Sequence, residues 1–163
     1  MKKFALMVAS SLALLGTQPA SAQTYSPAPG TWTWSGNVQV QKGSGPLLTC
    51  RLTVTANVTA TSATASASLG LGDIRCLTVS FTGSPYTVTW SAGPPETVTL
   101  NNVFVNTSIT PGNCAGNVTA NFNDSTNDAL VINTSIPQVT SGGACTIVGT
   151  LAKTAPAGAI DIS

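Results

Sequence analysis

The sequence contains no histidine, and only 7% of its 163 residues are charged. Without histidine, neither a Ser–His–Asp nor a Cys–His catalytic arrangement can form, and histidine-based zinc and copper sites are excluded. Acidic residues are also few: Glu96 is the only glutamate and follows two prolines, whereas most glycosidases need two carboxylates that face one cleft. We therefore predict a protein that is not an enzyme and that has no cofactor and no resident metal.

Basic residues are equally scarce. Two of the six lysines and arginines, Lys2 and Lys3, stand at the start of the chain, and the remainder has a net charge of about −1. Nucleic-acid binding needs a cluster of cations that neutralise phosphates, so this function is excluded, as is electrostatic docking on anionic lipid. A β-rich surface with so few charges tends to associate with itself.

Only one long hydrophobic run is present, at residues 4–15, and it is too short to span a bilayer. Lys2 and Lys3 precede it, and the small residues 20–22 follow it as a signal-peptidase site. We predict a cleaved Sec-type signal peptide at residues 1–22, typical of bacteria, and a secreted, extracellular or cell-surface protein. We predict no transmembrane segment in the mature chain; an uncleaved anchor helix at the N-terminus is the alternative.

Residues 23–163 suffice for one domain, with residues 23–30 as a flexible N-terminal arm. Residues 48–60 alternate strictly between apolar and polar side chains, the pattern of a half-buried antiparallel strand, and residues 63–69 repeat it as the return of a hairpin. Such runs recur between Gly, Pro and Asn turns, with no convincing helix. The sequence predicts an all-β fold, an antiparallel sandwich or barrel of about 8–10 short strands.

Two local expectations follow from the same patterns. Asn101 and Asn102 separate two short apolar runs and predict a hairpin turn, because asparagine tolerates positive φ. A strand is predicted to begin at Cys76, with Leu77 and Val79 on one face.

Four cysteines in an exported chain imply two disulfides, with three pairings open. The tetrapeptide Val-Thr-Ala-Asn begins four positions after both Cys50 and Cys114, and glycines precede both Cys76 and Cys145. We interpret this as an internal duplication, residues 48–82 and 112–151, which favours the pairs Cys50–Cys76 and Cys114–Cys145. A chance match of two Thr-rich strands is the alternative.

Four aromatic residues carry polar groups and form a candidate interaction surface: Trp32, Trp34, Tyr86 and Trp90. They can stack on sugars or pack in the core. The strand predicted at residues 31–41 can pair within its own domain or insert into the sheet of a neighbouring subunit.

Five stretches resemble bacterial exported proteins of the protein activator of alkane oxidation (PraB-like) family: residues 45–50, the strand at Cys76, residues 84–90, Cys114 after Pro111-Gly112, and residues 143–151. Together they cover most of residues 23–163, and none is a catalytic motif. The resemblance implies a small secreted protein that assists growth on hydrocarbons without oxidising them.

Three functions therefore stay open. The first is a non-enzymatic secreted or cell-surface protein that acts at a hydrophobic interface. The second is a self-assembling subunit of an extracellular filament or matrix, joined by β-strand pairing or exchange. The third is a glycan-binding adhesin module. The expected partners are a hydrocarbon interface or further copies of the chain.

Overall fold

The computed structural model describes residues 25–26, 30–70, 72–108, 110–123, 128–157 and 161–162. The predicted signal peptide and most of the predicted arm lie outside these residues. Strands dominate the described part, which holds one short 3-10 helix, η1, and no α-helix. The elements are β1 (Tyr25–Ser26), β2 (Gly30–Lys42), β3 (Leu48–Val58), β4 (Ala63–Gly70), η1 (Ile74–Thr78), β5 (Val79–Thr82), β6 (Tyr86–Ser91), β7 (Thr97–Thr107), β8 (Cys114–Asn123), β9 (Ala129–Ile136), β10 (Cys145–Ala155) and β11 (Asp161–Ile162).

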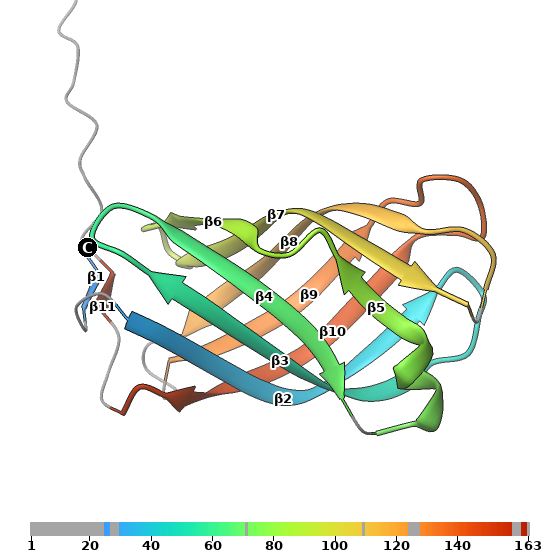
Figure 1. Ribbon diagram of the computed structural model, residues 1–163, viewed down its shortest axis with the longest axis horizontal. Coiled ribbons are helices and arrows are strands. Elements are labelled where there is room, and N and C mark those ends of the chain that lie inside the picture. Colours follow the sequence, from blue (N-terminus) through green and yellow to red (C-terminus); the bar gives the residue numbers. More distant parts are fainter. Residues whose placement is uncertain are drawn as a thin grey trace, which may run out of the picture.

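The strands from β2 to β10 form a closed antiparallel barrel that follows the chain around its circumference (Figure 1). Apart from β5, each of these strands pairs with the next along the chain, and β10 pairs with β2 to close the ring. β5 and β6 both pair with the same edge of β7: β5 lies opposite Phe104–Thr107, and β6 lies opposite Thr97–Leu100. These two short strands therefore occupy one strand position in an eight-stranded barrel wall. The all-β prediction is confirmed, and of its two forms the barrel is observed.

The period-two pattern decides which side chains face the interior. Along β3, Leu48, Cys50, Leu52 and Val54 are buried, while the residues between them are exposed or half-buried. β3 pairs with β4 from Arg51↔Gly70 to Val58↔Ala63, which confirms the predicted hairpin. One face of each strand thus packs inside the barrel and the other meets water.

The hairpin turn predicted at Asn101 and Asn102 and the strand start predicted at Cys76 are both wrong. Asn101 and Asn102 lie within the continuous strand β7 at a register shift between Leu100 and Val103, where Asn102 has φ +56°. The positive φ tolerated by asparagine is thus used in a β-bulge rather than in a turn. Cys76 lies in η1, and the strand starts only at Val79.

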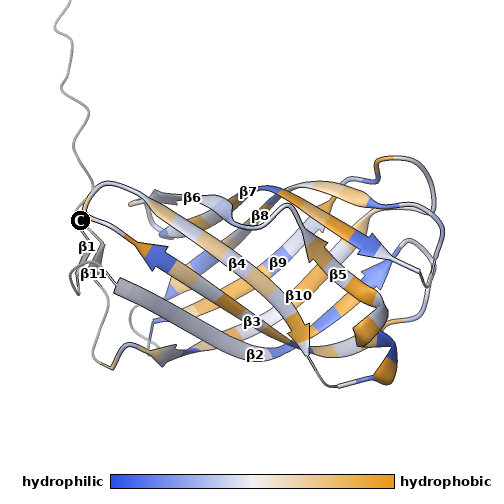
Figure 2. Ribbon diagram, in the orientation of Figure 1, coloured by the Kyte–Doolittle hydropathy of each residue, from blue (hydrophilic) through white to orange (hydrophobic). Residues whose placement is uncertain are grey.

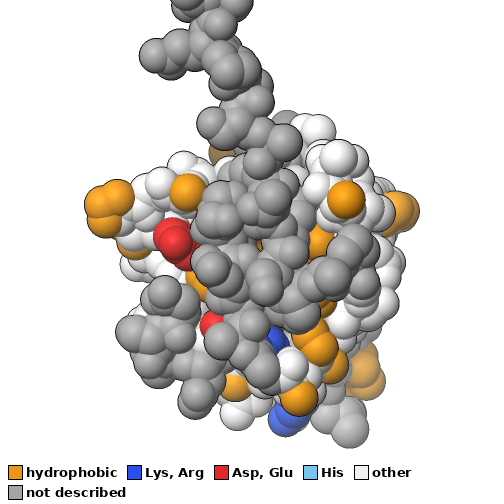
Figure 3. Space-filling model, turned by 90° about the vertical axis from the view of Figure 1, so that its left-hand side faces the viewer, with side chains coloured by type: hydrophobic (Ala, Val, Ile, Leu, Met, Phe, Trp, Pro, Cys, Tyr) orange, Lys and Arg blue, Asp and Glu red, His pale blue; other side chains and the backbone are white. Residues whose placement is uncertain are grey.

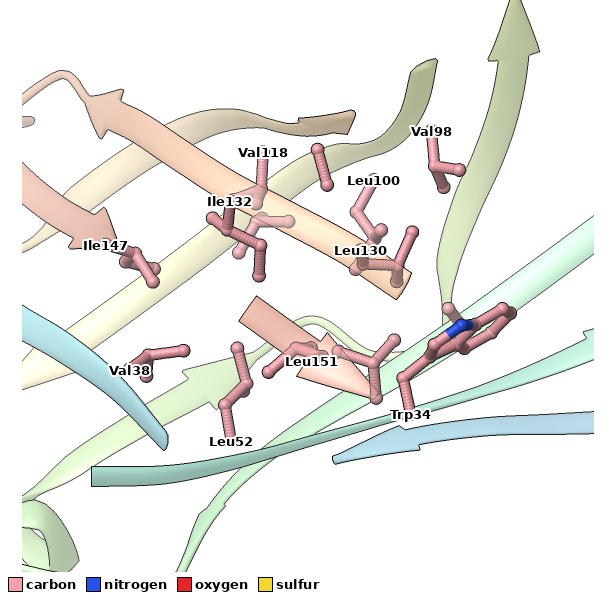
Figure 4. Packing of buried hydrophobic residues seen from close by; sticks show 14 of the residues in the cluster. Trp34, Val38, Leu52, Val98, Leu100, Val118, Leu130, Ile132, Ile147 and Leu151 are labelled. Carbon is pink, nitrogen blue, oxygen red and sulfur yellow. The ribbon is translucent and has the colours of Figure 1, made fainter. Parts of the chain in front are cut away.

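Two layers fill most of the barrel. Near the end that carries β1 and β11, Trp32 makes edge-to-face contacts with Trp34 and Trp90 at centroid distances of 6.2 and 6.1 Å. Aliphatic side chains of β2, β3 and β7–β10 meet in the middle (Figure 4). A cavity of about 30 Å³ is left among them, lined only by apolar residues. The interior is therefore a packed core and not a chamber for a large ligand.

Both disulfides lie at the opposite end, which we call the disulfide end. Cys50 at the start of β3 is bonded to Cys76 in η1, and Cys114 at the start of β8 is bonded to Cys145 at the start of β10. The predicted pairing is confirmed. No helix among the described residues is long and apolar enough to cross a membrane.

Removing a disulfide should destabilise the barrel. The two bridges close segments with sequence separations of 26 and 31 residues, for which the chain-entropy model gives about 3–4 kcal/mol each. We expect the Cys114→Ala/Cys145→Ala variant to lose about that much unfolding free energy in a urea titration. The Cys50→Ala/Cys76→Ala variant is the matched comparison, and unchanged midpoints in both would contradict the expectation.

Candidate functional site

The four aromatic residues offered as an interaction surface are buried. Trp32, Trp34, Tyr86 and Trp90 are 0–8% exposed, and all four belong to the core cluster. Tyr86 donates its hydroxyl to the carbonyl oxygen of Thr82 at 2.8 Å, and burial raises its pKa. The core-packing alternative is thus observed, because all four residues lie on inward faces of their strands; they form no exposed platform for a sugar ring.

The N-terminal strand of the barrel pairs within its own domain. β2 is hydrogen-bonded to β3 along one edge and to β10 along the other. Incomplete pairing occurs instead between β4 and β5: β4 pairs with β6 only through Ala63–Ala65, and no described ladder joins residues 66–70 to β5. Their Cα atoms still approach within 8 Å, which is too close for a whole extra strand to lie between them.

Two lysines point into the barrel, one at each end. Lys153 forms an ion pair with Asp128. The side chain of Lys153 is only 9% exposed and that of Asp128 only 2%. Asp128 also accepts the indole N–H of Trp34 at its carbonyl oxygen, at 2.8 Å. At the disulfide end, Lys42 donates from Nζ to the carbonyl oxygens of Pro111 (2.6 Å) and Ser141 (2.8 Å).

These inward lysines leave few charges on the outside of the barrel. Among the described residues, the outward cations are Arg51 and Arg75, and Arg75 is paired with Asp73. Arg51 donates from Nε to Ser35 at 3.1 Å. The outer surface is therefore built mainly from neutral polar and apolar side chains.

Three large apolar side chains are exposed at the disulfide end where η1 meets the start of β3; a fourth, Val139, is 54% exposed after β9, beside Asn113. Ile74 and Leu77 of η1 are 80% and 63% exposed, and Leu47, which leads into β3, is 53% exposed. A backbone hydrogen bond brings the three residues near one another. Asp73, which precedes Ile74, donates its N–H to the carbonyl oxygen of Thr49 at 2.9 Å, and Thr49 is two residues after Leu47. We call Leu47, Ile74 and Leu77 the apolar rim; η1 and its hydrophobic residues stand at the right of Figure 2.

The apolar rim is held rigidly although its side chains face water. Cys76, between Ile74 and Leu77, is fully buried and bonded to Cys50. Asp73 caps η1 by accepting the backbone N–H of Arg75, and the guanidinium of Arg75 donates to both of its oxygens at 2.9 and 2.6 Å. Fixing Ile74 and Leu77 in water adds no hydrophobic stabilisation to the fold, so this turn is a candidate contact surface.

The ion pair at Asp73 persists into acid. The hydrogen bonds from Arg75 lower the pKa of Asp73 from 3.8 to about 2. Because this pKa is depressed, the contribution of the pair is complete above pH 3.8 and is lost as the pH falls toward about 2. The cap of η1 is therefore intact across neutral and mildly acidic pH.

The opposite end of the barrel differs in character. Figure 3 shows a few acidic and basic side chains there, among scattered hydrophobic ones. An open depression at this end is lined by residues 92–96 and by Asn121, Asn123 and Val131, a mixture of polar and apolar groups. The disulfide end is thus the better candidate for an apolar contact.

Sequence reasoning missed the apolar rim and both inward lysines. Alternation predicts Leu77 on the same face as Val79, yet Val79 is buried and Leu77 is exposed, since η1 breaks the alternation. The signal for η1 was Asp73, a favourable cap residue two positions before Arg75. The signal for the lysines was their place in the alternation of each strand. Lys42 falls on the same face of β2 as Val38 and Val40, and Lys153 on the same face of β10 as Leu151.

The family model described as alkane oxidation protein activator PraA/PraB-like matches residues 1–162. No curated protein matched the chain, and no solved structure did.

Proposed function

Because the chain belongs to the alkane oxidation protein activator PraA/PraB-like family, we propose that it assists alkane oxidation by adsorbing to hydrocarbon through the apolar rim, without catalysing the oxidation itself. The observation that carries the proposal is the exposure of Ile74 and Leu77 on a turn fixed by a disulfide. The absence of histidine and the scarcity of carboxylates in the sequence support a non-enzymatic role.

The apolar rim can supply a useful binding energy. Complete transfer of a leucine or isoleucine side chain out of water contributes about 1.5–3 kcal/mol. Since the three rim residues are 53–80% exposed, we estimate about 3–6 kcal/mol for placing them in hydrocarbon. Apart from the paired Asp73 and Arg75 beside the rim, the weakly charged outer surface adds little electrostatic cost when it approaches an apolar phase.

The site of action that we propose is outside the cytoplasm. Two disulfides are expected of a protein that folds in an oxidising compartment. They also suit adsorption, because proteins tend to unfold at an oil surface and cross-links limit the expansion of the unfolded chain. A secreted or cell-surface protein would meet hydrocarbon before the alkane enters the cell.

The proposal is tested by adding the purified protein to cells that oxidise hexadecane. We expect faster oxygen uptake on hexadecane and no change on a water-soluble substrate such as succinate, because only the first is limited by contact with oil. The protein alone should consume no hexadecane. Equal stimulation on succinate, or hexadecane consumption without cells, would contradict the proposal.

Self-assembly into an extracellular filament or matrix is a second candidate. The observation that favours it is the lack of ladder pairing between residues 66–70 of β4 and β5, two segments without any charged residue. Strand addition there would require the two strands to separate further. Electron microscopy of the purified protein decides this candidate: ordered filaments would support it, and dispersed particles at every concentration and salt would reject it.

A further inference from the structure

A small pocket lies beside the apolar rim at the disulfide end. Its walls are largely apolar and come from the turn after β2 and from strands β2, β3, β5 and β7: Val40, Pro46, Leu48, Val79 and Val105. Pro46 directly precedes the rim residue Leu47, and Val79 stands two residues after Leu77. Two residues that line the pocket are thus close neighbours in the chain of two rim residues.

Four polar side chains also line this pocket, Gln41, Lys42, Thr107 and Thr110, and two of them have hydrogen-bonding capacity to offer a ligand, Lys42 and Thr110. Lys42 uses two N–H groups on the carbonyls of Pro111 and Ser141, and an ammonium has three. The Oγ1 atom of Thr110 is buried and has no hydrogen-bond partner within the described part of the chain. Buried hydroxyls in native proteins are seldom left unpaired, so both groups are suited to hold an oxygen atom of a ligand.

The electrostatics favour an anionic oxygen. The partners of Lys42 are neutral carbonyls, and neither ion pair found among the described residues involves it. The loops hold its position tightly, since a Cβ atom added to Gly142 would lie 2.5 Å from its Nζ. A buried cation without an anionic partner is complemented best by a charged acceptor.

Size and shape narrow the ligand further. The pocket has a volume of about 20 Å³, somewhat more than the roughly 10–15 Å³ that a single water requires. One oxygen of a carboxylate fits there, while the second oxygen and the attached chain remain at the mouth. An alkyl chain leaving the pocket would run over the apolar rim.

We propose that this pocket binds the carboxylate end of a linear aliphatic chain, with Lys42 and Thr110 holding the oxygen; the inference rests on the proposed function, because the rim that contacts hydrocarbon also receives the chain. Such alkanoates arise when the terminal carbon of an alkane is fully oxidised. The protein would therefore bind a product of the reaction that it assists as well as the hydrocarbon phase.

Calorimetric titration of the disulfide-bonded protein with sodium decanoate, below its micelle concentration, tests the proposal. We expect one saturable site, and binding of the matching ten-carbon primary alcohol weaker by about tenfold or more, because a hydrogen bond between charged groups is stronger than one to a neutral group. Thr110→Val should weaken decanoate binding about 2–10-fold and Lys42→Met about 10–100-fold. Lys42 also connects the loops of Pro111 and Ser141 by hydrogen bonds, so the Lys42→Met variant can fail to fold for that reason alone. In that case the decanoate affinity of Thr110→Val tests the proposal.

Equal affinities for decanoate and the alcohol, or unchanged binding by Thr110→Val, would overturn the pocket proposal. This failure is distinct from failure of the proposed function, because the titration contains no oil. Thr110→Val should still adsorb to hexadecane as the unaltered protein does. Decanoate binding weakened about 2–10-fold by Thr110→Val, together with normal adsorption, is the result that supports both proposals.

Discussion

Replacing Lys153 with methionine should lower the free energy of unfolding by about 3–5 kcal/mol. Lys153 and Asp128 form an ion pair with side chains 9% and 2% exposed, so the variant leaves a carboxylate in the barrel without its cation. The cost of burying a carboxylate from which its lysine has been removed exceeds what methionine gains by packing. Urea titration of the two proteins measures the difference.

A double variant separates the charge from the shape. Lys153→Met/Asp128→Asn removes both charges, and asparagine tolerates the φ of +54° found at residue 128. We expect it to recover most of the lost stability. Arg51→Met serves as the surface control and should change the unfolding free energy by less than about 0.5 kcal/mol. A Lys153→Met variant as stable as Arg51→Met would contradict the role assigned to the pair.

Removing the apolar rim should weaken adsorption to hydrocarbon at least about a hundredfold, since about 3–6 kcal/mol of transfer energy is lost and 1.4 kcal/mol is a factor of ten. The variant is Leu47→Gln/Ile74→Gln/Leu77→Gln. All three side chains already face water, so folding should be little affected. The adsorption constant comes from the tension of a hexadecane–water interface measured against protein concentration.

The matched control alters exposed apolar side chains elsewhere. Val131 and Val148 are 38% and 42% exposed on the outer faces of β9 and β10. Val131→Gln/Val148→Gln should shift the adsorption constant far less, because neither residue belongs to the proposed contact. Equal losses in the two variants would mean that the barrel adsorbs without a preferred face.

The sequence predicted the barrel wall and the disulfides well, for a physical reason. A strand with one face in a core must alternate, so residues 48–60 and 63–69 specify a hairpin by local chemistry alone. The disulfide pairing followed from the repeat after Cys50 and Cys114, and both bridges are formed as predicted. Whether this repeat reflects a true duplication stays a prediction.

The candidate site was harder to predict because it depends on contacts between distant segments. The carbonyl partners of Lys42 come from Pro111 and Ser141, in loops that only the closed barrel brings together. The apolar rim arises where η1 interrupts the alternation, so that Leu77 turns outward instead of inward. The alternation along β2 and β10 places Lys42 and Lys153 inside the barrel, but it does not predict which groups they contact.

Hydrogen exchange of the protein adsorbed on hexadecane droplets tests the central claim most directly. If the apolar rim contacts the oil, backbone amides of residues 45–49 and 72–78 should exchange more slowly than in the free protein, because oil excludes water from them. Amides of Ala92, Gly93 and Glu96, at the opposite end, should be unchanged. Slower exchange at residues 92–96 alone, or no protection at the disulfide end, would contradict adsorption through the apolar rim.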